Sequence, residues 1–445
     1  MTRPLAAIVM AAGLGTRMRS DRPKHLHPLL GRRVLDWALL PAQQLGPDPL
    51  VVVCSPATRD ELARTLPDQA ELVVQAEPRG TGDAVAVARP ALEGFSGDVL
   101  VLDGAAPLLT SEVLEELVAE HRRSDASVTV LSIEPEEPLP YGRVLRDEDG
   151  GLRAIVEEAD ASPEERAVQE LNTSIYVFAS DDLWPALARL EGDNAQGELY
   201  LTDAVGLLIE DGKRGAVYRA ADPIVGLGIN NRAELAQAAA VLRARLLDEH
   251  MLAGVTIIDP ATTWIEEGVE IEPEAVIHPF TVLRGSTIVR AGAEVGPHAV
   301  AVDAEIGLEA TVGPFAYLRP GTVLGPGVKV GAFVEVKNSS IGGRTKVPHL
   351  SYIGDADIGE DTNIAAGAIT ANYRPELEAG GKYRTVIGRN VHTGSDNVFV
   401  APVEIGDDAW IGAGSTITED VPPGALAIAR ARQVNKEGHG GKPND

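Results

Sequence analysis

Cysteine, aromatic residues and long apolar runs are all scarce in this chain of 445 residues. Its one cysteine, Cys54, follows the apolar run Leu50–Val53, so an intrachain disulfide is excluded and a buried, unreactive thiol is expected. Aromatic residues make up 4% of the sequence, so the core must consist mainly of Ile, Val and Leu. The sequence shows no signal-peptide pattern and no apolar run of membrane-spanning length, and we therefore expect a cytoplasmic protein.

Positive charge is also in short supply. The 39 Lys and Arg residues face 66 Asp and Glu residues, which gives a net charge of −27. Such a chain has no overall basic field to attract a phosphate polymer or an anionic bilayer, so nucleic-acid and membrane partners are not expected. A small phosphorylated substrate needs only a few local hydrogen-bond donors and stays compatible with this charge.

A strict repeat of six residues dominates the second half of the chain. Three series of mostly aliphatic residues keep this step: Ile306, Val312, Leu318, Leu324, Val330 and Val336; Ile271, Ile277, Leu283, Val289 and Val295; and Ile387, Thr393, Phe399, Ile405, Ile411 and Ile417. A period of six fits neither an amphipathic helix nor one long alternating strand. It predicts short strands wound into a hexapeptide solenoid, and an ordinary sandwich of short strands is the alternative.

The first half of the chain alternates strand and helix patterns, which predicts an α/β sheet with its ligand site beyond the carboxyl ends of the strands. The expected strands are Leu5–Met10, Leu50–Cys54, Leu72–Val74, Asp98–Leu102 and Val128–Ile133. After the third of them, Gln75 and the turn Gly80–Gly82 offer amide and backbone groups suited to reading a base. A polar turn without a ligand is the alternative for that segment.

A glycine-rich segment, Ala11–Met18, follows the first expected strand. Its small residues suit close approach of a phosphate to backbone N–H groups, and Arg17 and Lys24 supply the positive charge that a phosphate requires. The segment is not a dinucleotide-binding fingerprint, because Met18 stands where the third glycine belongs, and it is not a P-loop.

Together these segments resemble the signature of sugar-1-phosphate nucleotidylyltransferases. The matching segments are Met10–Met18, Pro23–Lys24, Gln75–Glu77, Gly80–Gly82, Tyr141–Arg143, Ile155–Glu157, Glu170–Thr173, Asn194–Glu198 and Asn230–Arg232. Coupled to a hexapeptide solenoid, they make the chain similar, from Leu5 to about Gly438, to the bifunctional family of N-acetylglucosamine-1-phosphate uridylyltransferases and glucosamine-1-phosphate N-acetyltransferases. The resemblance implies a Rossmann-like α/β nucleotidyltransferase domain followed by an all-β left-handed parallel β-helix. It also implies synthesis of UDP-N-acetylglucosamine with acetyl-CoA and UTP as co-substrates.

For the first domain the resemblance implies a site that holds nucleotide, sugar and Mg²⁺. The implied nucleotide contacts are Met10, Ala11, Ala12, Gly13, Lys24, Gln75, Gly80, Thr81, Asp103 and Gly104, and the implied sugar contacts are Gly142, Glu157 and Asn172. Arg17 and Lys24 would neutralise the triphosphate as pyrophosphate leaves, while Asn230 would coordinate the metal.

One position departs from that pattern and concerns the metal. The family carries an aspartate directly after the glycine of the loop Leu102–Leu108, where this chain has Ala105. Mg²⁺ prefers hard oxygen ligands, which a methyl group does not supply. Either Asp103, two positions earlier, reaches the metal, or uridylyl transfer is weak and recovers in Ala105→Asp. Leu14, where a cation is common in the family, is a second departure.

For the solenoid the resemblance implies an acetyltransferase site. His349 matches the family's general base, which removes a proton from the glucosamine amine as that amine attacks acetyl-CoA. The implied sugar-phosphate contacts are Arg319, Lys337, Tyr352, Asn363 and Lys382, and the implied acetyl-CoA contacts are Ala366, Asn372, Tyr373, Ser395, Ala413 and Arg430. The repeats break at 371–385, which predicts an inserted loop that carries function.

The predicted organisation is a nucleotidylyltransferase domain at 1–229, a helical linker at 230–253, a β-helix domain at 254–437 and a disordered tail at 438–445. Asn231 is the expected N-cap of a linker helix that runs to about Leu252. The resemblance also implies a homotrimer with acetyl-CoA between neighbouring solenoids.

Three alternatives stay open. The chain is an acetyltransferase with a weak nucleotide-binding domain, or a scaffold whose solenoid only trimerises, or a paralogue that uses another sugar phosphate or nucleotide. Ala105 supports the first, and the complete set of residues around His349 speaks against the second.

Overall fold

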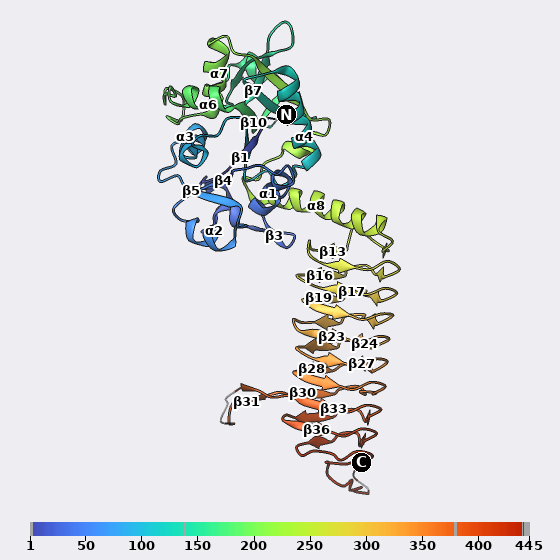
Figure 1. The fold of residues 1–445 in the computed structure, drawn as a ribbon. Helices are drawn as coiled ribbons and strands as arrows, with labels where there is room; N and C mark the ends of the chain where they lie inside the picture. Colours follow the sequence, from blue (N-terminus) through green and yellow to red (C-terminus); the bar gives the residue numbers. More distant parts are fainter. Residues whose placement is uncertain (1–2, 138, 378–380, 438, 440–445) are drawn as a thin grey trace, which may run out of the picture. The chain divides into compact units, whose positions relative to one another are not determined.

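The computed structural model describes residues 3–137, 139–377, 381–437 and 439. The chain divides into two compact units, an α/β unit that ends at Leu242 and a solenoid unit that begins at Arg243 (Figure 1). The division falls inside the helix that the sequence predicts as a linker. The predicted disordered tail lies, apart from His439, outside the described residues.

A mixed sheet forms the centre of the first unit, with the strand order β11-β7-β10-β6-β1-β4-β5 and with β8 and β9 attached at β10. The strands are β1 (Leu5–Ala11), β4 (Leu50–Cys54), β5 (Ala70–Val74), β6 (Asp98–Asp103), β7 (Val128–Ile133), β8 (Arg143–Arg146), β9 (Leu152–Val156), β10 (Leu171–Ala179) and β11 (Gly215–Arg219). β1 pairs in parallel with β4 and β6, whereas β10 runs antiparallel to β6 and β7. All five strands predicted from the sequence are confirmed, close to their expected bounds.

Helices cover both faces of this sheet. They are α1 (Val34–Gln44), α2 (Arg59–Thr65), α3 (Thr81–Ala86), α4 (Ser111–Ser124), α5 (Pro163–Arg166), α6 (Ser180–Leu187) and α7 (Leu201–Glu210). Side chains of β1 alternate between two apolar clusters: Ile8 packs with the α3, α6 and α7 side, and Val9 packs with the α1, α2 and α4 side. β1 is thus buried on both faces, and the chain first becomes exposed beyond its carboxyl end, at Gly13 and Leu14.

The second unit is a left-handed parallel β-helix. Its short strands run from β12 (Thr256–Ile257) to β39 (Leu426–Ala427) and stack into three parallel sheets, within which Ile277 pairs with Val295, three hexapeptides later. Residues of all three predicted series lie in its core, with Ile271 partly buried. The repeat therefore predicted both the fold and the residues that fill it.

The strands that carry or adjoin the candidate acetyltransferase residues belong to successive coils. They are β22 (Tyr317–Leu318), β25 (Glu335–Lys337), β27 (Lys346–His349), β28 (Tyr352–Gly354), β30 (Ile369–Ala371), β34 (His392–Thr393) and β37 (Trp410–Ile411). The predicted insertion begins and ends as an antiparallel pair, β31 (Tyr373–Arg374) and β32 (Gly381–Lys382), and β31 projects away from the solenoid (Figure 1).

Helix α8 (Arg232–Leu252) matches the predicted linker helix. Asn231 caps it as expected, because its side-chain oxygen accepts the N–H groups of Ala233 and Glu234 at 2.9 and 3.0 Å. No helix among the described residues is both long enough and apolar enough to cross a membrane.

Candidate functional site

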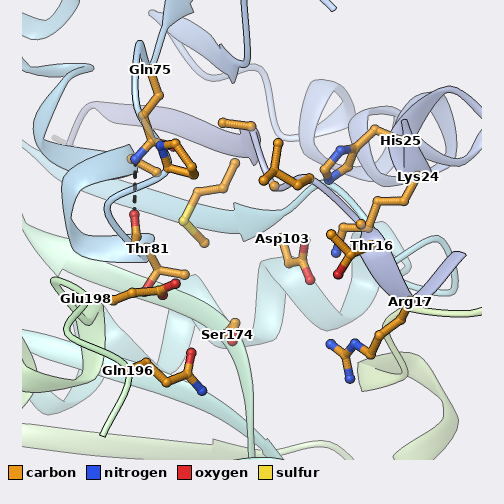
Figure 2. A pocket seen from close by; sticks show the side chains of 18 residues that line it. Thr16, Arg17, Lys24, His25, Gln75, Thr81, Asp103, Ser174, Gln196 and Glu198 are labelled. Carbon is orange, nitrogen blue, oxygen red and sulfur yellow. Dashed lines mark hydrogen bonds between the residues drawn. The ribbon is translucent and has the colours of Figure 1, made fainter. Parts of the chain in front are cut away.

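A cavity of about 480 Å³ opens beyond the carboxyl ends of β1 and β6 (Figure 2). Nine of the predicted residues line it: Met10, Ala12, Gly13, Arg17, Lys24, Gln75, Gly80, Thr81 and Asp103. Figure 2 shows the basic side chains of Arg17 and Lys24 on one side of the cavity and Gln75 and Thr81 on the other. The arrangement suits a ligand that is anionic at one end and carries a polar ring at the other.

Two glycines are required by the shape of this cavity. Gly15 adopts φ +62°, and a Cβ there would lie 2.8 Å from the Cβ of Lys24, so only glycine lets the loop pack over that lysine. Gly80 adopts φ +114°, and a Cβ would lie 2.5 Å from the carbonyl oxygen of Leu199. Gln75 is fixed beside it, because its amide donates to the carbonyl of Gly80 at 3.2 Å and to Asp83 at 2.8 Å.

A second cavity of about 180 Å³ adjoins the first and shares Arg17, Asp103 and Ser174 with it. The remaining predicted residues that line it are Gly142, Glu157, Asn172 and Asn230. The guanidinium of Arg17 donates to the side-chain oxygen of Asn230 at 3.0 Å. The expected nucleotide and sugar residues therefore face two connected spaces, with Arg17 and Asp103 at their junction.

Burial sets the electrostatics of the second cavity. Desolvation raises the pKa of Glu157, and a hydrogen bond from the Thr202 hydroxyl at 3.1 Å opposes this shift only in part. Burial likewise raises the pKa of Tyr141, whose hydroxyl accepts the Gly228 N–H at 3.1 Å. A sugar is a suitable occupant, because Glu157 accepts hydrogen bonds and the cavity wall carries both amide and hydroxyl groups.

The metal ligands expected at this junction are present in part. Asp103 lines both cavities, and its Oδ1 accepts the N–H of Ala105 at 2.9 Å, while Ala105 itself is fully buried and lines neither. The described residues contain no group of three or more His, Cys, Asp or Glu side chains that could hold a metal on their own. A carboxylate and the carboxamide of Asn230 fit Mg²⁺ when substrate phosphates complete its coordination.

Two predicted residues lie behind the cavity instead of in it. Ala11 is buried within the sheet, and Gly104 donates its N–H to the carbonyl of Met10 at 2.9 Å. Neither lines a cavity. Both support the loop that carries Asp103.

Sequence reasoning missed several lining residues, among them His25 and Ser174. Ser174 adopts a left-handed φ of 60° in an irregularity of β10, which no residue type in that segment signals. His25 is 1% exposed, and neither ring nitrogen has a hydrogen-bond partner among the described residues. Burial lowers the pKa of His25 to about 3, so the imidazole is neutral.

In the solenoid, register places the predicted residues Lys337 and Tyr352 on neighbouring rungs, whereas Asn363 belongs to the ladder of Lys346 and His392. Tyr317, Glu335 and Tyr352 align on successive rungs, and Lys337 aligns with Gly354. The Arg319 guanidinium donates to Glu335 at 2.7 Å. The neighbouring amine of Lys382 lowers the pKa of Lys337, as expected where cations converge on a site for an anion.

His349 ends β27, one corner before Tyr352. Single parallel β-bridges join Lys346 to Asn363 and Asn363 to His392. In the parallel pair of β34 and β37, His392 is then the partner of Trp410. Each of these four residues is followed, three positions later, by a predicted site residue. Lys346, Asn363, His392 and Trp410 are followed in this way by His349, Ala366, Ser395 and Ala413, respectively. The predicted general base and three predicted acetyl-CoA residues thus form one column along the outside of the solenoid, and Arg430 lies one coil beyond, beside Gly414.

The start of the inserted hairpin is tied to this site. Asn372 donates to the buried carboxylate of Asp355 at 2.5 Å and to the Tyr352 hydroxyl at 3.4 Å, whereas Tyr373 is exposed. His349, Ser395, Ala413 and Arg430 are exposed as well. Much of the predicted acetyltransferase site is therefore an open surface in one chain.

Comparison with known proteins finds matches in both units of the chain. The MobA-like NTP transferase domain matches residues 7–204, and the bacterial transferase hexapeptide (six repeats) matches residues 384–419. Bifunctional protein GlmU of Mycolicibacterium vanbaalenii is 46% identical over 460 residues, with 98% of this chain and 92% of the relative covered. The proteins of the same name from Streptomyces avermitilis and Thermobifida fusca are 47% and 46% identical, each with 98% of this chain and 94% of the relative covered. With nearly the whole of both chains aligned, this chain belongs to the family of bifunctional protein GlmU.

Proposed function

We propose that this chain makes UDP-N-acetylglucosamine in two steps. The solenoid transfers an acetyl group from acetyl-CoA to glucosamine-1-phosphate, and the α/β unit then transfers uridylyl from UTP to the N-acetylglucosamine-1-phosphate formed. The observation that carries the proposal is the full-length likeness to bifunctional protein GlmU, together with side chains suited to both reactions.

In the acetyl transfer, His349 acts as general base. Its neutral imidazole takes the proton that the glucosamine amine loses as it attacks the thioester carbon, and the thiolate of coenzyme A leaves. Arg319, Lys337 and Lys382 hold the sugar phosphate, because their charges converge on the rungs next to Tyr352. Asn363 and Tyr352 hold the sugar. The acetyl donor is held by Asn372 and Tyr373 and by the column of Ala366, Ser395 and Ala413 that continues from His349.

In the uridylyl transfer, a phosphate oxygen of the sugar attacks the α-phosphorus of UTP, and pyrophosphate leaves. Arg17 and Lys24 offset the charge that grows on the departing phosphates, while Gln75, Gly80 and Thr81 hold the base. Mg²⁺, when bound, supplies further charge neutralisation on the phosphates. Glu157, Asn172 and Gly142 orient the sugar from the adjoining cavity.

Asp103 supplies the carboxylate that position 105 lacks. Its place at the junction of both cavities, the second of which Asn230 also lines, supports this role over a metal site without any carboxylate. The reading in which uridylyl transfer is weak and recovers in Ala105→Asp remains the second candidate, favoured by the buried methyl group of Ala105.

A homotrimer completes the acetyltransferase site. The column below His349 is exposed in a single chain, and a thioester transfer benefits from a site that excludes water. A neighbouring solenoid covers this column, with acetyl-CoA between the two chains.

The test is to assay the two half-reactions separately on the native chain and on three variants. We expect His349→Ala to lower acetyl transfer by about 10² or more, the usual contribution of a general base, and to leave uridylyl transfer unchanged. We expect Asp103→Asn to lower uridylyl transfer by about 10²–10³ and to leave acetyl transfer unchanged.

Ala105→Asp serves as the matched variant for the metal. If the native chain releases pyrophosphate weakly and Ala105→Asp restores the rate, Asp103 does not replace the missing ligand. Near-normal acetyl transfer in His349→Ala would contradict the assignment of the general base.

A further inference from the structure

A stacked pair of rings, the half-buried His392 and the exposed Trp410, lies on the outside of the last coils of the solenoid. The two residues face each other across the parallel pair β34 and β37, and their ring centroids are 4.5 Å apart in a stacked arrangement. Trp410 is 56% exposed, and Leu426, the next residue in the same column, is 66% exposed. A stacked, open aromatic face of this kind suits a flat ligand that covers it.

The position of this pair along the solenoid relates it to His349. Lys346, Asn363, His392 and Trp410 follow one another in a single ladder of paired residues, and His349 stands three residues after the first of them. Trp410 is therefore three rungs beyond the strand of His349, about 14 Å at a spacing of about 4.8 Å per strand. An extended pantetheine arm that begins at His349 reaches this distance.

The corner positions between His349 and the ring pair carry small residues. The corner residues of the intervening rungs are Ala366, Ser395 and Ala413, whose short side chains leave room for a thin chain. Arg430, on the next coil, adds a positive charge beyond the rings, beside Gly414. In a protein with a net charge of −27, a cation at this end is suited to the phosphates of a nucleotide.

We propose that Trp410, supported by His392, is the platform on which the adenine base of acetyl-CoA stacks. The inference rests on the proposed acetyl transfer and adds to it the residue that selects for the nucleotide part of the donor. Stacking of a base on an aromatic side chain contributes enough to change affinity by roughly ten- to one-hundredfold. His392 stacks on one side of the indole ring, and the base covers the exposed part of Trp410 on the side of Leu426.

The experiment compares two acetyl donors on the full chain, acetyl-CoA and acetyl-pantetheine, which carries the same thioester arm without the nucleotide. We expect Trp410→Ala to raise the KM for acetyl-CoA about tenfold or more and to leave the KM for acetyl-pantetheine unchanged. Trp410→Phe keeps an aromatic face and retains most of the affinity for acetyl-CoA.

Phe315→Ala is the matched control. Phe315 is also exposed and stacked, between His298 and Phe333, but it lies on the other side of His349 along the solenoid. We expect this variant to leave the discrimination between the two donors unchanged. Light scattering on each variant reports whether the oligomer is retained.

Other outcomes overturn the inference. An equal loss with both donors in Trp410→Ala, or a change of oligomeric state, would mean that the rings contact a second copy of the chain. No change in the KM for acetyl-CoA would mean that the base binds elsewhere. A native chain that transfers acetyl from neither donor would overturn the proposed function itself, and the inference with it.

Discussion

At the scale of single residues, His25 shows how a site departs from the rules of a protein core. Buried polar groups normally have hydrogen-bond partners, yet both ring nitrogens of His25 lack one among the described residues. His27, two positions later, is also buried, and its Nε2 lies 3.1 Å from the carbonyl of Arg22. Leaving a buried donor or acceptor unpaired costs about 1–3 kcal/mol.

The first prediction at this scale concerns stability at neutral pH. We expect His25→Leu to raise the melting temperature of the α/β unit, because an apolar side chain of similar size removes the unpaired nitrogens. His27→Leu should lower it, because that change removes a hydrogen bond. Calorimetry of the full chain at pH 7.5 measures both, and a lower melting temperature in His25→Leu would show that the imidazole has a partner.

The same residue predicts a dependence on pH. The pKa of His25 is about 3 in the folded chain and about 6.5 when unfolded, so between these values the unfolded state binds more protons. The free energy of unfolding therefore falls as the pH drops below about 6.5, with a contribution of up to ~1.4 kcal/mol per pH unit. Denaturant titrations at several pH values give the free energy of unfolding at each pH. Between about pH 3 and 6.5 this free energy should change less steeply with pH in His25→Leu than in the native chain.

At the scale of strands and helices, the sequence predicted those elements whose buried residues follow a regular pattern along the chain. The step of six from Ile306 to Val336 fixes which side chains fill the core, since each strand offers one inward position per coil. The apolar run Leu50–Cys54 predicted a strand because a doubly covered parallel strand is apolar on both faces.

What the sequence did not predict depends on contacts between distant segments. The cavity position of Ser174 follows from an irregularity where β10 meets β7, and the place of His25 follows from the packing of the segment after Gly15. The role of Asp103 was left open, because the sequence pattern alone does not tell whether position 103 or position 105 faces the cavity. The column of His349, Ala366, Ser395 and Ala413 needed the register of the coils, since the insertion at 371–385 interrupts the count of six.

A glycine in the solenoid gives the prediction at this scale. A Cβ at Gly354 would overlap the hydroxyl end of the Tyr352 ring, which is a movable side chain, so the coil itself can stay intact. We expect Gly354→Ala to displace Tyr352 and lower kcat/KM for acetyl transfer by about tenfold, the equivalent of one lost hydrogen-bonding contact. The melting temperature should change little, and Tyr352→Phe, which keeps the ring in place, separates the hydroxyl from the ring as the source of the effect.

At the scale of the whole molecule, the two sites differ in how much of them one chain supplies. Both cavities of the α/β unit are lined by residues of a single chain, from Met10 to Asn230. The proposed acetyltransferase residues instead follow the outside of the solenoid from Arg319 to Arg430, and His349, Ser395, Ala413 and Arg430 among them are exposed. Uridylyl transfer should therefore be independent of association, and acetyl transfer should require it.

Dilution tests this difference directly. We expect light scattering to give a trimer at micromolar concentration, because most oligomers of identical chains are closed and symmetric, and a ring of three joins two different surfaces of neighbouring chains. On dilution below the point at which the trimer dissociates, the specific activity for acetyl transfer should fall in proportion to the trimer that remains, while the specific activity for uridylyl transfer should stay constant. If scattering shows single chains that acetylate at full rate at every concentration, the open column below His349 binds its donor without a neighbour. If both activities fall together, association instead stabilises the fold of the chain as a whole.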